Sequence, residues 1–535
     1  MKKLLAILFT SMLLVSVMTP IALAADDGFV DGKFTETRHI TVEIFDRSTD
    51  GTVVDDNVYT DFIKQGMLDK YNVEVEFVTV PRWEENNLIP TYLAAGSAPD
   101  VSYTYNDGAI YTYFLQDAVL DLQPLLTEYM DLIPDLNALL GEANMTWKLN
   151  PYTGANYAIC ARRMNVARIN TFVREDWLNK LGLAVPTTTQ EFEDMLYAFK
   201  ENAELLLGAD ADKMVPYAMT EDVGWEANNI LYSFVPDEFT VDKYNYIYND
   251  DRQFLLPGIK EGVRMLNKWY NDGLILQDFS LYVAGDETVG NQMKAGFVGA
   301  LEANWDNPYR NGEESIHYML QQAQGEDAVY IAINPFKNDA GITKKVNYST
   351  NDRWLFFPYT NDEPLASLLY LNFISIFENR LFLQIGTEGI NYELTADGAI
   401  KSIPVEAGRN KMSSSNNIDT TMVINGLDLG DTAKTAQTMA LGYANVDPRF
   451  IETAYATAMT NGISYANFNL GDIAAAEGMS NVLAEKRNVV LNTAINASVA
   501  DFDAVFDAGM ADYLASGGQA IIDERMEKWV AAFGE

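Results

Sequence analysis

The chain has 535 residues, more than one hydrophobic core usually spans, so two or three domains are expected. Hydrophobic residues make up 48% and charged residues 21%, a composition typical of a globular protein rather than a disordered or fibrous one. The formal net charge of −39 repels phosphate backbones and anionic membrane surfaces, so no nucleic-acid partner is predicted. Because Cys160 is the single cysteine and no HExxH sequence is present, internal disulfides and cysteine- or HExxH-based zinc sites are excluded.

The first 24 residues have the pattern of an export signal. Lys2 and Lys3 precede an apolar run at residues 4–17, and residues 22–24 form an Ala-Leu-Ala cleavage site. The apolar run is short for a membrane span, so cleavage is favoured over anchoring. Since no cysteine follows the run, the mature chain is predicted to reach a periplasm or the extracellular cell surface without an N-terminal lipid anchor.

Strands and helices alternate in the first part of the mature chain. Ile40, Val42 and Ile44 share one face of the first predicted strand, and the later strands are rich in β-branched or aromatic residues. The predicted strands are residues 39–45, 73–80 and 101–105, and the helices between them are residues 57–70 and 84–95. This order implies a mainly parallel sheet covered by helices.

The middle and the end of the chain are richer in helix. Thr188 and Glu191 have capping-box spacing at the start of one helix. Further helices are predicted at residues 257–272, 364–378 and 449–460, and short buried strands at residues 296–301 and 329–333. No Ser/Gly linker divides the chain, so the domains must be joined by short ordered crossings.

Motifs for nucleotide binding and nucleophilic catalysis are absent from the sequence. It contains no GxGxxG, GxxxxGK[ST] or GxSxG stretch, and its two histidines leave little room for a Ser-His pair. Glu84 with Glu85, or Glu302 with Asp306, has the composition of a glycosidase pair, although solvated surface acids are the favoured interpretation. No catalytic residue, cofactor or metal is predicted, and the protein is not expected to be an enzyme.

Polar and aromatic residues follow the three predicted strands at their carboxyl ends, where parallel sheets bind ligands. They are Asp46 and Arg47, then Arg82 and Trp83, then Tyr105, Asn106 and Asp107. Ring faces cover the C–H face of a sugar, and charged and amide groups pair with its hydroxyls. A sugar-binding rim is therefore predicted, and for each single residue the alternative is local packing or a nearby ion pair.

Three more tryptophans are candidate ligand-binding residues. Trp305 follows a predicted strand, which favours the site. Trp225 lies beside polar residues, so a ligand-binding position and a core position are equally favoured. Trp354 follows Asp-Arg and is more typical of a core position, although it is retained as a candidate.

Five stretches carry a family resemblance. They are residues 95–101, 173–183, 266–275, 293–299 and 386–393, of which the Asp-Trp-Leu-x-Lys-Leu-Gly-Leu segment within residues 173–183 is the most specific. In these stretches the chain resembles the extracellular solute-binding proteins of ABC importers, in the carbohydrate group known as family 1 and its long, lipoprotein-type branch. The similarity extends over nearly the whole mature chain.

The resemblance implies an α/β, two-lobe periplasmic-binding-protein-like fold of type II, with a mainly parallel sheet flanked by helices in each lobe and a ligand cleft between the lobes. The expected divisions are a signal peptide at 1–24, an N-terminal lobe at 36–165 plus 340–400, and a C-terminal lobe at 166–339 plus 401–535. A crossing between lobes is expected at residues 165–168.

The resemblance also implies a function without catalysis. The expected protein is a monomer that binds a carbohydrate, preferably an oligosaccharide, and delivers it to the membrane subunits of an ABC permease. By position in the family pattern, Asn106, Asp107 and Trp305 match sugar-contacting positions, and Asp46 and Arg47 match a charged turn. Two alternatives stay open: a secreted glycan-active enzyme that uses paired carboxylates, and a binder of another solute such as a peptide.

The sequence departs from the family pattern in two places. Ala25 stands where a lipid-modified cysteine would begin the mature chain. Asp210 and Asp212 keep part of a calcium loop that some long members carry, but the other oxygen ligands expected of such a site are missing, so no structural calcium is predicted there.

Overall fold

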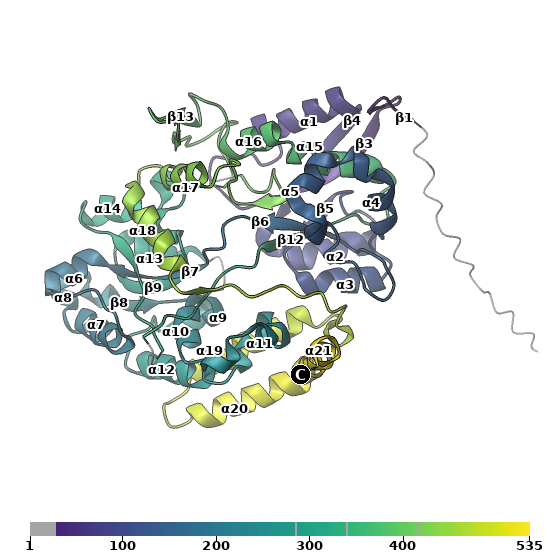
Figure 1. Ribbon diagram of the computed structural model, residues 1–535. Helices are drawn as coiled ribbons and strands as arrows, with labels where there is room; N and C mark the ends of the chain where they lie inside the picture. The colour runs from purple at the N-terminus through teal and green to yellow at the C-terminus, as the bar shows by residue number, and fades with distance from the viewer. Residues whose placement is uncertain (1–27, 284–285, 339–340, 415–416, 535) are drawn as a thin grey trace, which may run out of the picture.

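The computed structural model describes residues 28–283, 286–338, 341–414 and 417–534. The predicted export signal, residues 1–24, lies outside these ranges. Within them, no helix combines the length and the apolar character that a membrane crossing requires. The chain forms two α/β lobes, which confirms the predicted fold class (Figure 1).

The first lobe begins with a parallel strand pair. β3 (Arg38–Asp46) runs alongside β4 (Val73–Pro81) in register over its full length, and α1 (Val58–Tyr71) connects them. α2 (Glu85–Ala95) follows β4, and the chain then forms a parallel bridge from Val101 to Val42 before β5 (Ser102–Thr104). The strand-helix-strand start predicted from hydrophobic alternation is therefore confirmed.

The other strands of this lobe do not all run in the expected direction. β15 (Ile424–Asn425), β6 (Ile159–Arg163), β12 (Asn351–Phe356) and β5 form one sheet in that order. β12 is antiparallel to both β6 and β5. The sheet is mixed rather than mainly parallel, because β12 enters the first lobe directly from the second and not through a helical crossover.

The second lobe is built on a sheet with the order β10, β7, β9, β8. These strands are β7 (Ile169–Arg174), β8 (Val215–Ala218), β9 (Val298–Asn304) and β10 (Tyr330–Ile333). β7 is antiparallel to both of its neighbours, and only β8 and β9 run parallel, so this sheet is mixed as well. The chain passes between the lobes several times, which allows strands to enter a sheet from either end.

Helices cover both faces of the second sheet. One core includes side chains of α7 (Thr189–Glu201), α12 (Ile259–Asn271) and α19 (Ser480–Asn496). The opposite core includes side chains of α13 (Glu287–Ala295), α14 (Ile316–Gln324) and α18 (Pro448–Met459). The predicted cap of α7 is present, since the backbone N–H of Glu191 donates to Thr188 Oγ1 at 3.2 Å.

The core of the first lobe lies among residues 34–161, 354–383 and 422–424. It includes α15 (Pro364–Ser375), almost all of which is buried and which packs on α1 and α5 (Pro134–Met145). Residues 422–424 were predicted to belong to the second lobe. They pack in the core of the first lobe instead, because β15 pairs with β6. The remaining assignment of segments to the lobes stays a prediction.

Two of the segments that join the lobes run side by side. The backbone N–H of Arg163 donates to the carbonyl of Thr350 at 2.7 Å, and that of Tyr348 donates to Val166 at 2.9 Å. A third segment joins them, since the backbone N–H of Asn347 donates to Ile463 at 2.9 Å. The crossing expected at residues 165–168 thus lies next to the return crossing that leads into β12.

Candidate functional site

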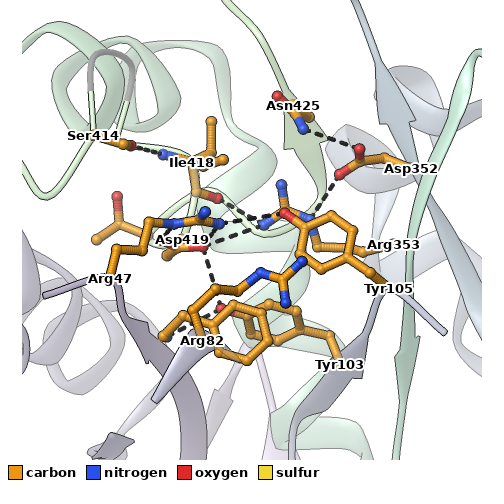
Figure 2. A network of polar contacts seen from close by, with 12 residues as sticks. Arg47, Arg82, Tyr103, Tyr105, Asp352, Arg353, Ser414, Ile418, Asp419 and Asn425 are labelled. Carbon is orange, nitrogen blue, oxygen red and sulfur yellow. Dashed lines mark hydrogen bonds and ion pairs between the residues drawn. The ribbon is translucent and has the colours of Figure 1, made fainter. Parts of the chain in front are cut away.

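An arginine–carboxylate cluster lies at the edge of the first lobe, formed by Arg47, Arg163, Arg353, Asp352 and Asp419. Figure 2 labels these residues except Arg163. Arg47 follows β3, and its Nε and Nη2 donate to the two oxygens of Asp419 at 2.5 and 2.9 Å. Arg353 Nε donates to Asp352 at 2.8 Å, and Arg353 Nη1 lies 3.6 Å from Asp419. Arg163 pairs with Asp352 as well. Three guanidinium groups thus share two carboxylates.

The carboxylates of this cluster are fully buried. Burial alone raises the pKa of Asp352, but the guanidinium groups of Arg163 and Arg353 hold that pKa below its usual range. The buried Nη2 of Arg353 has no hydrogen-bond partner among the described residues. The cluster is therefore ionised and carries more positive than negative charge.

Aromatic rings stack against these arginines. The guanidinium carbon of Arg353 lies 5.0 Å from the ring centre of Tyr105, and that of Arg82 lies 4.3 Å from the same ring. Arg82 also lies 5.1 Å from the ring of Trp83 and pairs with Glu85 at 3.2 Å. The side chain of Trp83 is 64% exposed. The strand ends thus present a ring face and several donors to solvent.

The crossing between the lobes carries a tyrosine between two arginines. The guanidinium carbons of Arg163 and Arg168 lie 4.1 and 5.9 Å from the ring centre of Tyr348. Arg168 immediately precedes β7 in the second lobe, and it stacks on Trp225 of α9 (Val223–Glu226) at 4.7 Å. The hydroxyl of Tyr348 donates to Asn304 at the end of β9 at 2.8 Å. A continuous run of arginine and aromatic side chains therefore extends from the first lobe into the second.

A cavity of about 360 Å³ adjoins the second-lobe end of this run. Its lining residues are Arg168, Asp222, Gly224, Trp225, Asn228, Leu231, Tyr232, Gln253, Phe254, Ile259 and Arg487. They come from α9, α10 (Asn228–Ser233), the 3₁₀ turn at Asp250–Leu255, and helices α12 and α19. Ring faces, amides and charged groups together are the lining expected of a site for a small polar ligand.

The structure brings three of the predicted site residues together. Arg47, Arg82 and Tyr105 meet in the first lobe, where Arg47 Nη2 donates to the hydroxyl of Tyr105 at 3.4 Å (Figure 2). Trp83 lies beside them on Arg82. Trp225 lies in the second lobe and lines the cavity.

The other predicted residues have local partners. Asp46 accepts the backbone N–H of Ser48 at 2.7 Å, and Asn106 caps α3 (Asp107–Leu115) by accepting the backbone N–H of Ala109 at 3.2 Å. Asp107 pairs with Lys148. The role of these three residues as ligand contacts remains a prediction.

Trp305 and Trp354 are the most buried of the predicted residues. Only 4% of Trp305 and 5% of Trp354 is exposed. Trp305 packs edge-on against Tyr443 and Tyr455 in the second lobe, and Trp354 lies in the core of the first lobe under Lys148. Their burial leaves little surface for a ligand in this conformation.

Several central residues were not predicted as site residues: Arg168, Tyr348, Asp352, Arg353 and Asp419. Asp419 contacts Arg47 although 372 residues separate them in the sequence, and no local sequence pattern predicts such a contact. For Asp352 and Arg353 the sequence did hold a signal of a functional position. Two charged residues stand in one strand directly before large apolar residues.

The carboxylate pair considered for catalysis does not face one pocket. Glu302 on β9 is 1% exposed and accepts the hydroxyl of Thr171 at 3.1 Å and the backbone N–H of Asn229 at 2.8 Å. Burial raises its pKa to about 8. Asp306 instead pairs with Arg310 and accepts the hydroxyl of Tyr443 in the opposite core. The two acids have separate structural partners.

Within the described ranges, no cluster of three or more His, Cys, Asp or Glu side chains is arranged to hold a metal ion. In the stretch compared with a calcium loop, Asp210 pairs with Lys213 at 2.7 Å. The absence of structural calcium at Asp210 and Asp212 remains a prediction.

No family model matches the chain. Among curated proteins, lipoprotein LipO of Bacillus subtilis (strain 168) is 26% identical over 220 residues, which cover 40% of this chain. The aligned part spans 41% of that lipoprotein, less than half of its length.

Solved structures match over almost the whole chain. Alginate-binding protein AlgQ2, in a structure without calcium ion, has a TM-score of 0.65 at 14% identity and covers 94% of this chain and 99% of its own. An EF-hand mutant of the ABC-transporter substrate-binding protein FusA of Streptococcus pneumoniae, in complex with fructo-nystose, has a TM-score of 0.64 at 12% identity, with coverages of 93% and 100%. The N-glycan transport solute-binding protein NgtS of Streptococcus pneumoniae has a TM-score of 0.55 at 15% identity, with coverages of 93% and 100%. The chain therefore has the two-lobe fold of solute-binding proteins.

Proposed function

We propose that this chain is the solute-binding component of an ABC importer, and that it holds a carbohydrate, preferably an oligosaccharide, between its lobes. The observation that carries the proposal is the run of arginine and aromatic side chains from Arg47 through Tyr348 to Arg168. A ligand laid along this run contacts both lobes at once. Such a ligand shifts the equilibrium between open and closed lobes toward the closed form.

The chemistry of the run supports a sugar. Trp83 and Trp225 offer ring faces for C–H surfaces, while Arg82 and Asn228 offer donors and acceptors for hydroxyls. The names of the matched structures, which refer to alginate, fructo-nystose and N-glycan transport, support the same ligand class.

The proposal includes the setting in which the protein works. The mature chain acts outside the cytoplasm as a monomer, binds without catalysis, and passes its ligand to the permease subunits in the membrane. The N-terminal lobe consists of residues 36–165 and 340–400 together with the segment around β15, and the rest of the mature chain forms the C-terminal lobe. The separate partners of Glu302 and Asp306 support binding rather than hydrolysis.

A thermal-shift screen of the mature chain tests this function. Neutral and acidic mono- and oligosaccharides and a few peptides are added, and each ligand that shifts the melting temperature is recovered and analysed. A ligand at 100 times its dissociation constant stabilises the protein by about 2.7 kcal/mol, which is easily measured. An intact sugar after a shift supports the proposal, a cleaved sugar indicates an enzyme, and a response to peptides alone rejects the sugar assignment.

A pair of variants locates the site. Trp83→Ala removes an exposed ring beside Arg82, and we expect about a threefold to tenfold loss of affinity for the best sugar with little change in melting temperature. Tyr359→Ala is the matched control, because Tyr359 is 56% exposed. It lies near Gly96, which precedes β5, and not at the carboxyl ends of β3, β4 and β5 that form the rim. Equal losses for both variants would reject the rim as the binding site.

A further inference from the structure

The loop at residues 403–414, which precedes β15, reaches from the first lobe to the second. It packs on the first lobe, where the backbone N–H of Gly408 donates to the carbonyl of Gly51 at 3.0 Å. A Cβ atom added at Gly51 would lie 2.7 Å from the carbonyl oxygen of Glu406, so only glycine allows this close approach of the two backbones. The backbone of Glu406 is therefore held against the first lobe.

An ion pair joins this loop to the second lobe. Lys411 Nζ lies 3.4 Å from Glu314 Oε1, and it also donates to the carbonyl of Asp50 in the first lobe. Glu314 ends the 3₁₀ turn at Gly312–Glu314, which comes directly before α14 of the second lobe. Lys411 thus has one partner in each lobe, and this interlobe ion pair favours contact between the lobes.

A pair of acids lies beside the interlobe ion pair. Glu313 immediately precedes Glu314, and its carboxyl group lies next to that of Glu406 on the first-lobe loop. A hydrogen bond to the Glu406 carboxyl group and the negative charge of Glu406 both raise the pKa of Glu313. When both carboxyl groups are ionised they repel each other, so this interlobe acid pair favours separation of the lobes.

The two pairs therefore act in opposite directions at one contact between the lobes. We propose that the interlobe ion pair and the interlobe acid pair together set the balance between open and closed lobes, an inference that rests on the proposed function for its two forms of the protein. None of the four side chains lines the second-lobe cavity. They influence binding through the fraction of closed molecules, because the apparent affinity falls as the binding-competent fraction falls.

Distances between spin labels on the two lobes of the unliganded mature chain measure this balance. One label is attached through Tyr359→Cys in the first lobe and the other through Leu205→Cys on α8 (Ala203–Leu207) in the second lobe. The two side chains are 56% and 65% exposed, whereas the native Cys160 is buried and should not react with the label. Double electron–electron resonance then gives the proportions of the shorter and longer distances.

Two variants should change these proportions in opposite directions. Glu406→Gln removes the repulsion from Glu313, and we expect the ratio of closed to open molecules to rise about twofold to fivefold, the range for one solvent-exposed charge pair. Glu314→Gln removes the second-lobe partner of Lys411, and the ratio should fall by a similar factor. Glu406→Lys should raise the ratio further than Glu406→Gln, because it adds an attraction to Glu313. Added salt should reduce each of these changes.

Glu393→Gln and Lys401→Gln are matched controls. These two residues form an ion pair at 2.8 Å between β13 (Tyr392–Leu394) and β14 (Ile400–Ser402), the two strands of one hairpin, so the pair does not join the lobes. Both controls change the net charge by the same amount as the test variants do, and we expect the label distances to stay as in the parent.

The outcomes separate this inference from the proposed function, since the measurement contains no sugar. Opposite changes in Glu406→Gln and Glu314→Gln support the inference whatever ligand the protein binds. Unchanged distances in all the test variants, changes of Glu406→Gln and Glu314→Gln in the same direction, or equal changes in the controls overturn it and leave the sugar-binding proposal as it stands. Melting temperatures close to the parent value show that the distances report lobe position and not misfolding.

Discussion

Arg353 shows how the first-lobe cluster depends on single residues. Its side chain is fully buried, it contacts Asp352 and Asp419, and it lies against the ring of Tyr105. Each of the two carboxylates has a second arginine, Arg163 or Arg47. Loss of Arg353 therefore leaves the two acids partly compensated instead of isolated.

Replacing Arg353 with glutamine should lower the free energy of unfolding by about 2–3 kcal/mol. Removal of one partner from a buried pair usually costs about 3–5 kcal/mol, and the remaining arginines reduce that cost. Urea unfolding of the unliganded protein measures the change, with Arg449→Gln as an exposed control that should stay within about 0.5 kcal/mol. If Arg353→Gln lowered the free energy of unfolding no more than Arg449→Gln does, the cluster would add nothing to stability.

His317 gives a stability that depends on pH. It is 2% exposed and packs against Tyr309 and Phe450, and burial lowers its pKa to about 4, with Arg449 adding to the shift and Asp447 opposing it. The unfolded chain binds a proton near the ordinary pKa of about 6.5, whereas the folded chain does not. The contribution of neutral His317 to the free energy of unfolding is therefore fully present above about pH 6.5 and is lost as the pH falls toward 4.

The variant His317→Phe removes this titration while keeping a ring in the core. Between pH 7 and pH 4 the parent should lose up to about 3 kcal/mol more than the variant, at about 1.4 kcal/mol for each unit of pKa shift. Urea unfolding of both proteins at several pH values gives the difference. Parallel pH curves would contradict a buried, neutral histidine.

At the scale of helices and strands, the segment after α18 binds to the first lobe. Figure 1 shows the chain after α18 crossing toward α21 (Gln519–Phe533), beside which it passes before it enters α19. On this path Asn469 Nδ2 donates to the carbonyl of Trp147 at 2.7 Å, and Asp472 accepts Asn150 Nδ2 at 2.5 Å and the hydroxyl of Tyr157 at 3.2 Å. This C-terminal segment links elements of both lobes.

Replacing Asp472 with alanine should loosen that link. The expected loss is about 1–2 kcal/mol of unfolding free energy, because two side-chain hydrogen bonds disappear and Asn150 loses a charged acceptor. Amide hydrogen exchange should rise over residues 147–157 and 468–476 together. Increased exchange in only one of these ranges would mean that the segment does not couple the two regions.

Most individual elements could be predicted because their signal is local. Alternating Ile40, Val42 and Ile44 predict β3, and the Thr188 and Glu191 pair predicts the start of α7. Strand direction was not predicted for β12, because its partners depend on a path through the other lobe. The predicted residues that lie in the candidate site either follow a strand end, as Arg47, Arg82 and Tyr105 do, or line the cavity, as Trp225 does. Asp419 and Arg168 were not predicted, because they reach the site from distant segments.

At the scale of the whole molecule, three segments join the lobes, and we expect the lobes to bend relative to each other at these segments. Residues 163–166 and 348–350 share backbone hydrogen bonds, so these two segments are expected to bend together. A ligand that contacts Arg47 and Arg168 should favour one relative position of the lobes.

Small-angle X-ray scattering should therefore give a smaller radius of gyration with a bound sugar than without it. The change should disappear in Arg168→Gln at a sugar concentration that saturates the parent but not the variant. An unchanged radius in the parent, with binding proved by calorimetry, would show that the ligand does not close the lobes.

The stacking of Arg168 on Trp225 also has an optical consequence. A cation 4.7 Å from an indole ring alters the energy of its excited state, and a ligand bound at that cation alters it again. Trp305 and Trp354 are almost fully buried in the two lobes, whereas Trp83 is exposed in the proposed rim and responds to a ligand there. The part of the tryptophan emission that Trp225→Phe removes is thus a label-free signal of events in the second-lobe cavity.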